Sequence, residues 1–193
     1  MRGKLFQGTI KTCSESLKTN KKTGFLLMII RPEVAQDRAA IATLIARTYG
    51  AQGAKIIEQT GELRALDVYR NDLSFIAESE DEKAVQAFSL MTPVAVEGKQ
   101  VGVVLAPFAM NVYNPEFDVP AFFEAVFEKV EAAGFSHVFA LGRLDDLSPL
   151  GFEYADAHGI TLNEELDPSL LVKVFKNAPK CAGTVVFPQP LLV

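Results

Sequence analysis

The sequence has few of the residues from which covalent cross-links and metal sites are built. Its 193 residues include two cysteines, Cys13 and Cys181, and two histidines. A disulfide framework needs more cysteines, and a zinc-binding helix needs a second ligand one turn from the first. Neither His137 nor His158 has such a neighbour. The sequence therefore predicts no disulfide and no metal site, and this cysteine usage favours a reducing, cytoplasmic compartment.

Long apolar runs are also missing. The longest unbroken run is the six-residue stretch 25–30. A helix needs about 20 apolar residues to cross a bilayer. The sequence therefore predicts no membrane-spanning segment.

Positive charge is scarce outside the first part of the chain. The formal net charge is −5, and residues 1–27 hold six Lys and Arg residues against one acidic residue. The remainder is strongly acidic and lacks the basic surface that nucleic-acid binding requires. We predict no nucleic-acid partner. Residues 1–27 have no apolar period and are interpreted as a basic, disordered leader, in preference to an organelle-targeting peptide. The expected domain is 28–193.

Hydrophobic periodicity in that domain switches between the strand and helix patterns. Apolar residues spaced three and four apart predict helices around 41–50, 60–70 and 120–134. Pro93 interrupts the long apolar run 84–96, and short apolar runs predict the remaining strands. The expected strands are 28–30, 73–78, 84–96, 101–107, 137–141, 171–175 and 184–187. This order predicts a mixed α/β fold with about six or seven mostly antiparallel strands, flanking helices and one parallel junction between central strands.

Several short segments carry a resemblance to a known family. They are Ile-Arg-Pro-Glu at 30–33, Met-Thr-Pro-Val at 91–94, Leu-Ala-Pro-Phe-Ala-Met at 105–110, Ala-Ala-Gly-Phe at 132–135, Gly-Phe at 151–152 and Gly-Thr-Val at 183–185. Together with the order of elements, these segments resemble a bacterial subgroup of the GNAT superfamily of acyl-CoA-dependent N-acetyltransferases. The resemblance covers about residues 28–188.

The resemblance implies a cofactor and a chemistry. Acetyl-CoA would insert its pantetheine arm between the fourth and fifth strands, and its diphosphate would lie at the N-terminus of the following helix. An acyl group would pass to the amine of a small molecule or peptide. The residues implied as cofactor-binding are Phe108, Ala109, Met110, Asn114, Phe117, Val119 and Pro120. Glu78 is the candidate general base, and Tyr154 is the candidate acid for the departing thiolate.

Two stretches depart from the family pattern. The diphosphate turn is glycine-rich in the family, but 113–119 has no glycine and contains Pro115, Glu116 and Asp118. These carboxylates would repel a diphosphate, and Asp118 is well placed to cap the helix that follows. A tyrosine pair expected soon after Leu141-Gly142 is also missing. Asp145 and Asp146, which follow there, fit a solvated turn better than an acid–base pair.

Three hypotheses therefore stay open at the sequence level. The first is an N-acetyltransferase that uses acetyl-CoA or another acyl-CoA. The second is a GNAT-like binding or regulatory module that no longer turns over acetyl-CoA. The third is a homodimer-forming protein, because the apolar residues 191–193 could support association.

Overall fold

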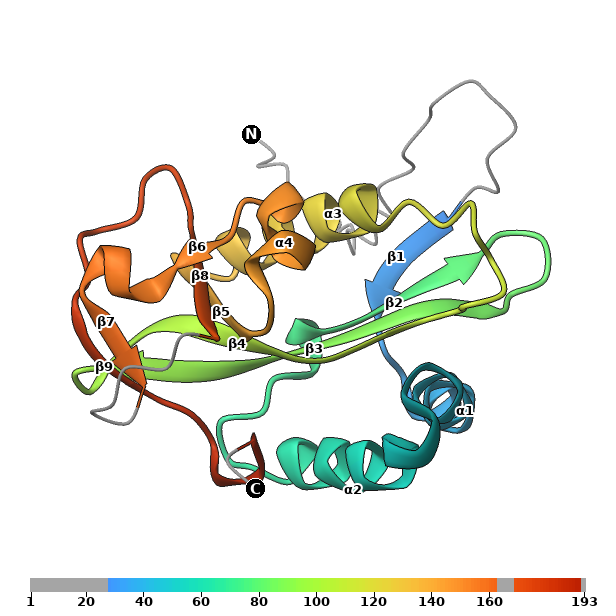
Figure 1. Cartoon of the computed structure of the whole chain (residues 1–193). Helices are drawn as coiled ribbons and strands as arrows, with labels where there is room; N and C mark the ends of the chain where they lie inside the picture. Colours follow the sequence, from blue (N-terminus) through green and yellow to red (C-terminus); the bar gives the residue numbers. More distant parts are fainter. Residues whose placement is uncertain (1–27, 163–168, 192–193) are drawn as a thin grey trace, which may run out of the picture.

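The computed structural model describes residues 28–162 and 169–191, so the predicted leader at 1–27 lies outside the described residues. One sheet forms the centre, with α1 and α2 on one face and α3 and α4 on the other (Figure 1). The helices are α1 (Arg38–Tyr49), α2 (Gly53–Arg64), α3 (Val119–Ala132) and α4 (Leu144–Leu147). The strands are β1 (Met28–Pro32), β2 (Ser74–Ser79), β3 (Val85–Val96), β4 (Lys99–Met110), β5 (His137–Leu141), β6 (Glu153–Tyr154), β7 (Ile160–Leu162), β8 (Leu170–Val174) and β9 (Gly183–Val186).

The sheet confirms the predicted mixed topology. Its strand order is β1-β2-β3-β4-β5-β8-β6, and β9 joins β7 to β3. The central β4–β5 pair is parallel and its neighbours are antiparallel. A second parallel pair, β7 with β9, was not predicted. Among the described residues the sheet has nine strands rather than six or seven, because β6 and β7 contain only two and three residues, which is too few for a recognisable period in the sequence.

Each face of the sheet has its own hydrophobic core. Under α3, a phenylalanine-rich stripe packs against apolar side chains of the central strands. Under α1 and α2, a separate aliphatic cluster packs against the other face. The α3 stripe consists of Phe122, Phe123, Val126, Phe127 and Val130. These residues follow the three-and-four spacing of an amphipathic helix, so the sequence pattern and the buried face coincide.

The predicted bounds of the second helix were wrong, whereas those of the strand at 84–96 were confirmed to within one residue. The second helix spans Gly53–Arg64 rather than 60–70, and its first residue, Gly53, packs closely against α1. A Cβ at Gly53 would lie 2.7 Å from the Cα of Ala46. Strand β3 runs without a break through Pro93, which lies where pairing with β2 has ended at Leu90 and pairing with β9 has not begun. Proline is tolerated where a strand edge is unpaired.

The β4–β5 contact is short and tight. The strands pair only where Gly102, Val103 and Val104 face 137–139. A Cβ on Gly102 would lie 2.7 Å from the ring of Phe139, so the close approach of the strands depends on glycine here. Beyond Val104, β4 continues to Met110 without pairing to β5. The two central strands therefore diverge toward their carboxyl ends.

Candidate functional site

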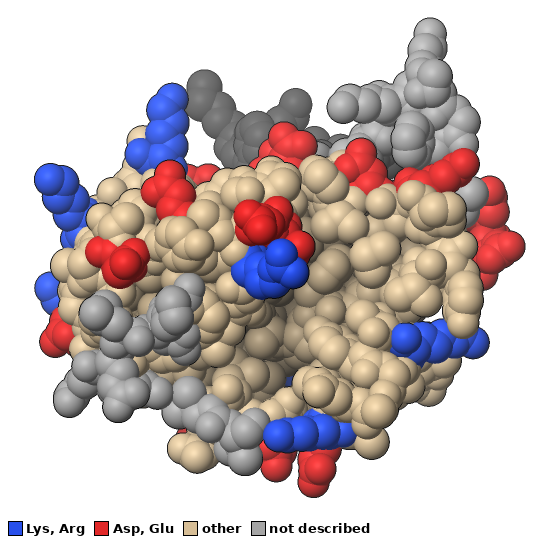
Figure 2. Space-filling view, in the orientation of Figure 1, with Lys and Arg blue, Asp and Glu red and all other residues tan. Residues whose placement is uncertain are grey.

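The opening between β4 and β5 is the main candidate site. The strands are parallel, so both reach the same edge of the sheet, where ligands of open α/β sheets commonly bind. Figure 2 shows that this face is hollowed near its centre, in a largely uncharged area with acidic side chains along the upper rim. Large apolar side chains are exposed where the strands end, at Leu141, the last residue of β5, and at Val112 and Tyr113 after β4. An opening with exposed apolar groups suits an extended, partly apolar ligand.

The free edge of β4 presents backbone groups toward this opening. The amide of Asn111 donates to the carbonyl of Gln86 on β3 at 2.7 Å. Because strand residues alternate, Met110 and Phe108 direct their N–H and C=O groups to the opposite side. Beyond Val104 no strand pairs with that side within the described part of the chain. Another extended chain could pair there if it replaced the two side chains of α1 that bond to these groups.

Two side chains of α1 reach the same edge, and no pattern in the sequence indicated these contacts. The hydroxyl of Tyr49 donates to the carbonyl of Phe108 at 2.7 Å. The hydroxyl of Thr48 lies 3.0 Å from the carbonyl oxygen and 3.3 Å from the amide nitrogen of Met110. Burial raises the pKa of Tyr49, so the phenol stays protonated at neutral pH. In the sequence, Thr48 contributed only to the three-and-four spacing that predicted the first helix.

Most of the predicted cofactor-binding side chains belong to the core. The ring of Phe108 lies 4.8 Å from Phe123 and 5.9 Å from Phe122, centre to centre. Phe117 is also buried and lies 5.8 Å from Phe122. Ala109 is buried on the opposite face, among residues packed under α1. What these positions can offer a ligand is mainly the backbone of β4, because their side chains hold α3 on the sheet.

The turn between β4 and α3, residues 111–118, is called the acidic turn below. Four of its backbone amides bond to acceptors within the turn. Asn111 accepts from the amides of Tyr113 and Asn114, at 3.2 and 3.0 Å. Asn114 accepts from the amides of Glu116 and Phe117, each at 3.2 Å. These amides therefore already have acceptors.

The first turn of α3 is capped by the protein itself, as the sequence predicted for Asp118. Its carboxylate accepts from the amide of Ala121 at 2.9 Å. Val119 and Pro120, both predicted to bind a cofactor, are the first two residues of the helix, and Pro120 has no N–H to donate. The cap occupies the end of the helix dipole that would otherwise attract an anion.

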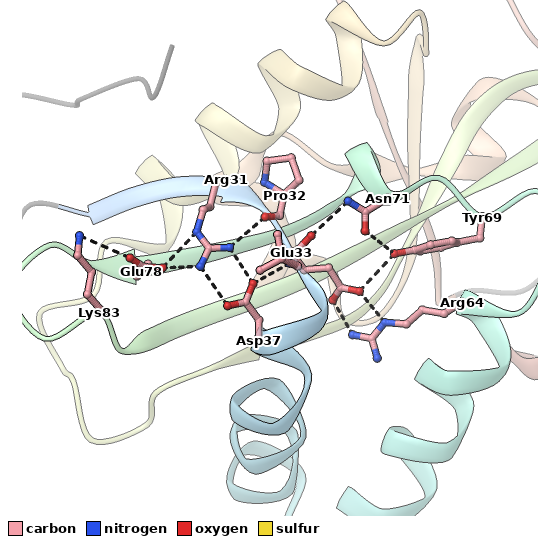
Figure 3. Close-up of polar contacts among 10 residues, drawn as sticks. Arg31, Pro32, Glu33, Asp37, Arg64, Tyr69, Asn71, Glu78 and Lys83 are labelled. Carbon is pink, nitrogen blue, oxygen red and sulfur yellow. Dashed lines mark hydrogen bonds and ion pairs between the residues drawn. The ribbon is translucent and has the colours of Figure 1, made fainter. Parts of the chain in front are cut away.

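The predicted base Glu78 lies among paired charges on the α1 side of β1 and β2 (Figure 3). Its carboxylate binds the guanidinium of Arg31 through two hydrogen bonds, one of them 3.1 Å long, and lies 3.7 Å from Lys83. Arg31 also binds Asp37 at 2.7 and 3.0 Å. The Arg31 guanidinium holds the pKa of Asp37 below its usual value, and Asp37 and Glu78 together raise the pKa of Arg31. These contacts give Glu78 a structural role, and its catalytic role remains a prediction.

A third carboxylate, that of Glu33, lies beside this group (Figure 3). Glu33 has only 1% of its surface exposed and receives two hydrogen bonds from Arg64, at 2.8 and 2.6 Å. The hydroxyl of Tyr69 lies 3.2 Å from the same carboxylate. The paired-charge cluster is defined as Arg31, Glu33, Asp37, Arg64 and Glu78. Each of its carboxylates has a guanidinium partner, which is what burial of charge requires.

The predicted acid Tyr154 does not meet Glu78. It lies on the short strand β6, which pairs with β8, so that β5 and β8 separate it from β4. Its side chain is largely exposed. The structure therefore brings Phe108 and Met110 to the β4 edge, and Asn114, Phe117 and the start of α3 to the adjacent turn. Glu78 and Tyr154 lie elsewhere on the sheet, and the role of Tyr154 also stays a prediction.

Residues 28–162 and 169–191 contain neither a metal-binding cluster nor a membrane-spanning helix. No group of three or more His, Cys, Asp and Glu residues there is arranged to hold a metal ion. Within the same residues, no helix is both long and apolar enough to cross a bilayer. His137 is buried, and burial is the main reason its pKa is lowered. Its Nδ1 lies 2.9 Å from the hydroxyl of Ser136.

Comparison with known proteins identifies solved structures with a similar fold. No family model matches the chain. No curated protein matches it either. Among solved structures, the chain is similar to the GNAT family N-acetyltransferase YhbS of Escherichia coli in complex with CoA. That similarity has a TM-score of 0.74 at 21% identity and covers 90% of this chain and 97% of the other.

Two further solved structures support the same assignment. A GNAT family acetyltransferase of Brucella melitensis in complex with acetyl-CoA has a TM-score of 0.66 at 20% identity, over 86% of this chain and 99% of that one. The ribosomal-protein-S18-alanine N-acetyltransferase of Escherichia coli has a TM-score of 0.54 at 15% identity, over 79% and 97%. The mostly antiparallel sheet, the parallel β4–β5 pair and the flanking helices match these structures. The chain therefore has the GNAT-superfamily fold, as its sequence predicted.

Proposed function

We propose that this protein is an N-acyltransferase that moves an acyl group from an acyl-CoA thioester, acetyl-CoA in the simplest case, to an amine. The observation that carries the proposal is the divergence of β4 and β5 after Val104, which leaves the β5-facing edge of β4 unpaired, up to Met110, by any strand of the described residues. Two similar solved structures were determined with CoA or acetyl-CoA. The fold alone does not fix a function, so the proposal depends on this edge.

The β4 edge suits the pantetheine arm of such a donor. The arm contains two amides in an extended chain, and such amides can pair with the outward backbone groups of Phe108 and Met110 if they replace the hydroxyls that bond there in this structure. Tyr49 and Thr48 already contact these groups from α1, and therefore lie beside the proposed path. A bound donor would supply an activated acyl thioester.

The chemistry needs an uncharged amine. Its nitrogen attacks the thioester carbonyl carbon, a C–N bond forms, and the C–S bond breaks with its electron pair going to sulfur. The amine nitrogen loses one proton to a base, and the thiolate gains one to become the free thiol. The acceptor amine belongs to a small molecule or a peptide. We keep Glu78 and Tyr154 as the sequence-predicted base and acid to be tested.

A donor-binding measurement combined with a turnover assay tests the proposal. Acetyl-CoA at about 100 times its Kd should stabilise the fold by about 2.7 kcal/mol, which thermal melting detects. Release of free thiol is then followed with a panel of primary amines. Absence of both a thermal shift and amine-dependent thiol release at millimolar acetyl-CoA would overturn the proposal.

A matched pair of surface variants locates the donor. Leu141 is exposed at the carboxyl end of β5, beside the opening, and Val186 is exposed on β9 at a different part of the sheet. We expect Leu141→Asp to weaken acetyl-CoA binding by about tenfold, whereas Val186→Asp should leave it unchanged. Equal effects of the two substitutions would place the donor elsewhere. The substitutions Glu78→Gln and Tyr154→Phe test the predicted roles, because loss of a general acid or base lowers kcat about 10²–10⁴-fold.

A further inference from the structure

We infer that this protein selects its donor through the acyl-pantetheine arm alone, and that the acidic turn excludes the diphosphate of the nucleotide from the N-terminus of α3. The inference rests on the proposed function and specifies its donor class. That class is the acyl thioesters of pantetheine, whatever is attached to the far end of the arm. It follows from the contacts within the turn.

The turn has few amides left for a phosphate. A phosphate site at a helix N-terminus is made of backbone N–H groups without other partners. Here the amides of Tyr113, Asn114, Glu116 and Phe117 bond to acceptors within the turn. The amide of Ala121 bonds to the carboxylate of Asp118. A diphosphate would have to displace these bonds to gain its own.

The charge at the turn has the wrong sign for a diphosphate. Glu116 and Asp118 are both exposed, and neither has a Lys or Arg partner in the part of the chain that the structure describes. Two carboxylates therefore face solvent where the nucleotide of a donor emerging past Met110 would lie. Repulsion between like charges opposes its diphosphate.

The turn is also held in place from below. The side-chain amide nitrogens of Asn111 and Asn114 donate to the same oxygen of Gln86, at 2.9 and 3.3 Å. Gln86 is buried on β3, in the middle of the sheet. Phe117 anchors the other end of the turn against Phe122. A rearrangement that freed the amides for phosphate would break these contacts together.

Calorimetric titration of the full chain with four probes tests the inference. The probes are acetyl-CoA, S-acetyl-4′-phosphopantetheine, S-acetylpantetheine and adenosine 3′,5′-diphosphate. We expect the three thioesters to bind with Kd values within about threefold of one another, and the nucleotide fragment not to bind. Acetyl-CoA binding more than about 30-fold tighter than S-acetylpantetheine would overturn the inference and leave the proposed function standing. Binding of none of the thioesters would overturn both.

The sign of the salt dependence gives a second readout. Repulsion by Glu116 and Asp118 is screened by salt, so the affinity for acetyl-CoA should rise between low and moderate ionic strength. The affinity for uncharged S-acetylpantetheine should not change. A fall in acetyl-CoA affinity with salt would indicate a cationic diphosphate contact and would contradict the inference.

Charge-matched variants assign the effect to the turn. In Glu116→Gln/Asp118→Ser, serine still caps the helix, so we expect folding to be retained and acetyl-CoA to bind about three- to tenfold tighter. S-acetylpantetheine should bind as before. The control Glu124→Gln/Glu128→Gln removes the same charge from the exposed side of α3. If both double variants strengthened acetyl-CoA binding equally, net charge rather than the turn would be responsible, and the inference would fail.

Discussion

The paired-charge cluster and the acidic turn use carboxylates in opposite ways. In the cluster, Glu33, Asp37 and Glu78 are largely buried and each binds a guanidinium. In the turn, Glu116 and Asp118 are exposed, and Asp118 binds only the backbone. The first arrangement couples β1, α1, α2 and β2, whereas the second closes the start of one helix. The structural cost of losing a carboxylate should therefore be large in the cluster and small in the turn.

The largest effect is expected at Glu33. In Glu33→Gln the Arg64 guanidinium keeps its place without a charged partner, and breaking one side of a buried pair costs about 3–5 kcal/mol. Urea denaturation at pH 7 measures this loss. The control Asp72→Asn removes the partner of Arg70 in an exposed pair at 2.6 Å, where about 0–1 kcal/mol is expected. Similar losses for the two variants would contradict the contrast between buried and exposed pairs.

The next effect concerns the short contact between β4 and β5 at Gly102. Gly102→Ala places a Cβ against Phe139 and the carbonyl of His137, and overpacking of this kind costs about 1–3 kcal/mol. The matched substitution Gly61→Ala lies on the exposed side of α2 with no atom within 4 Å of the new Cβ, and should stabilise the helix by about 0.5–1 kcal/mol. Thermal melting of both variants checks the opposite signs. Stability changes of the same sign would show that close packing does not set the β4–β5 contact.

Asp37 should make the free energy of unfolding depend on pH in the acidic range. Its pKa in the folded protein lies below the ordinary value of 3.8, chiefly because of its hydrogen bonds to Arg31. A lowered pKa contributes stability above the unfolded value, and that contribution is lost as the pH falls through the folded value. Asp37→Asn should thus lose about 1.5–3 kcal/mol at pH 6 and show a smaller further loss at pH 3 than the wild type. Urea denaturation at both pH values tests this, and parallel pH profiles would contradict it.

The smallest effect is expected in the turn. Asp118→Ala removes the cap on Ala121 and should cost about 1 kcal/mol. Asp118→Ser should restore most of that loss, because a serine hydroxyl also accepts from helix amides. Glu116→Ala should change stability by less than about 0.5 kcal/mol. Equilibrium unfolding of the three variants measures these changes. If only the charge of Asp118 mattered, Asp118→Ala and Asp118→Ser would lose the same stability.

The sequence predicted the elements whose pattern is local. The three-and-four spacing of Phe123, Val126 and Phe127 identified α3, and Pro120 after Asp118 identified its start and cap. The limits of α2 could not be obtained this way, because they depend on the contact between Gly53 and Ala46 across two helices. A weak apolar period at Leu66 and Tyr69 misplaced that helix.

The candidate site was predictable only in part. The segment 105–110 and the glycine-free turn after it could be recognised because each is a run of consecutive residues. The contacts of Tyr49 and Thr48 with β4 cross about sixty residues of chain, and no local pattern encodes them. The pairing of Glu78 with Arg31 is likewise a tertiary contact between neighbouring strands. This is why Glu78 resembled a free base in the sequence and has a guanidinium partner in the structure.

The single oxygen of Gln86 that receives both asparagines has a practical consequence for engineering. Replacing Asn111 and Asn114, both half-buried, with glycines would leave this inward-facing acceptor without its two donors, buried and unsatisfied. A nucleotide-binding turn therefore cannot be grafted here by surface changes alone. Position 86 would have to be redesigned at the same time, which makes donor preference a property of the sheet interior as much as of the loop.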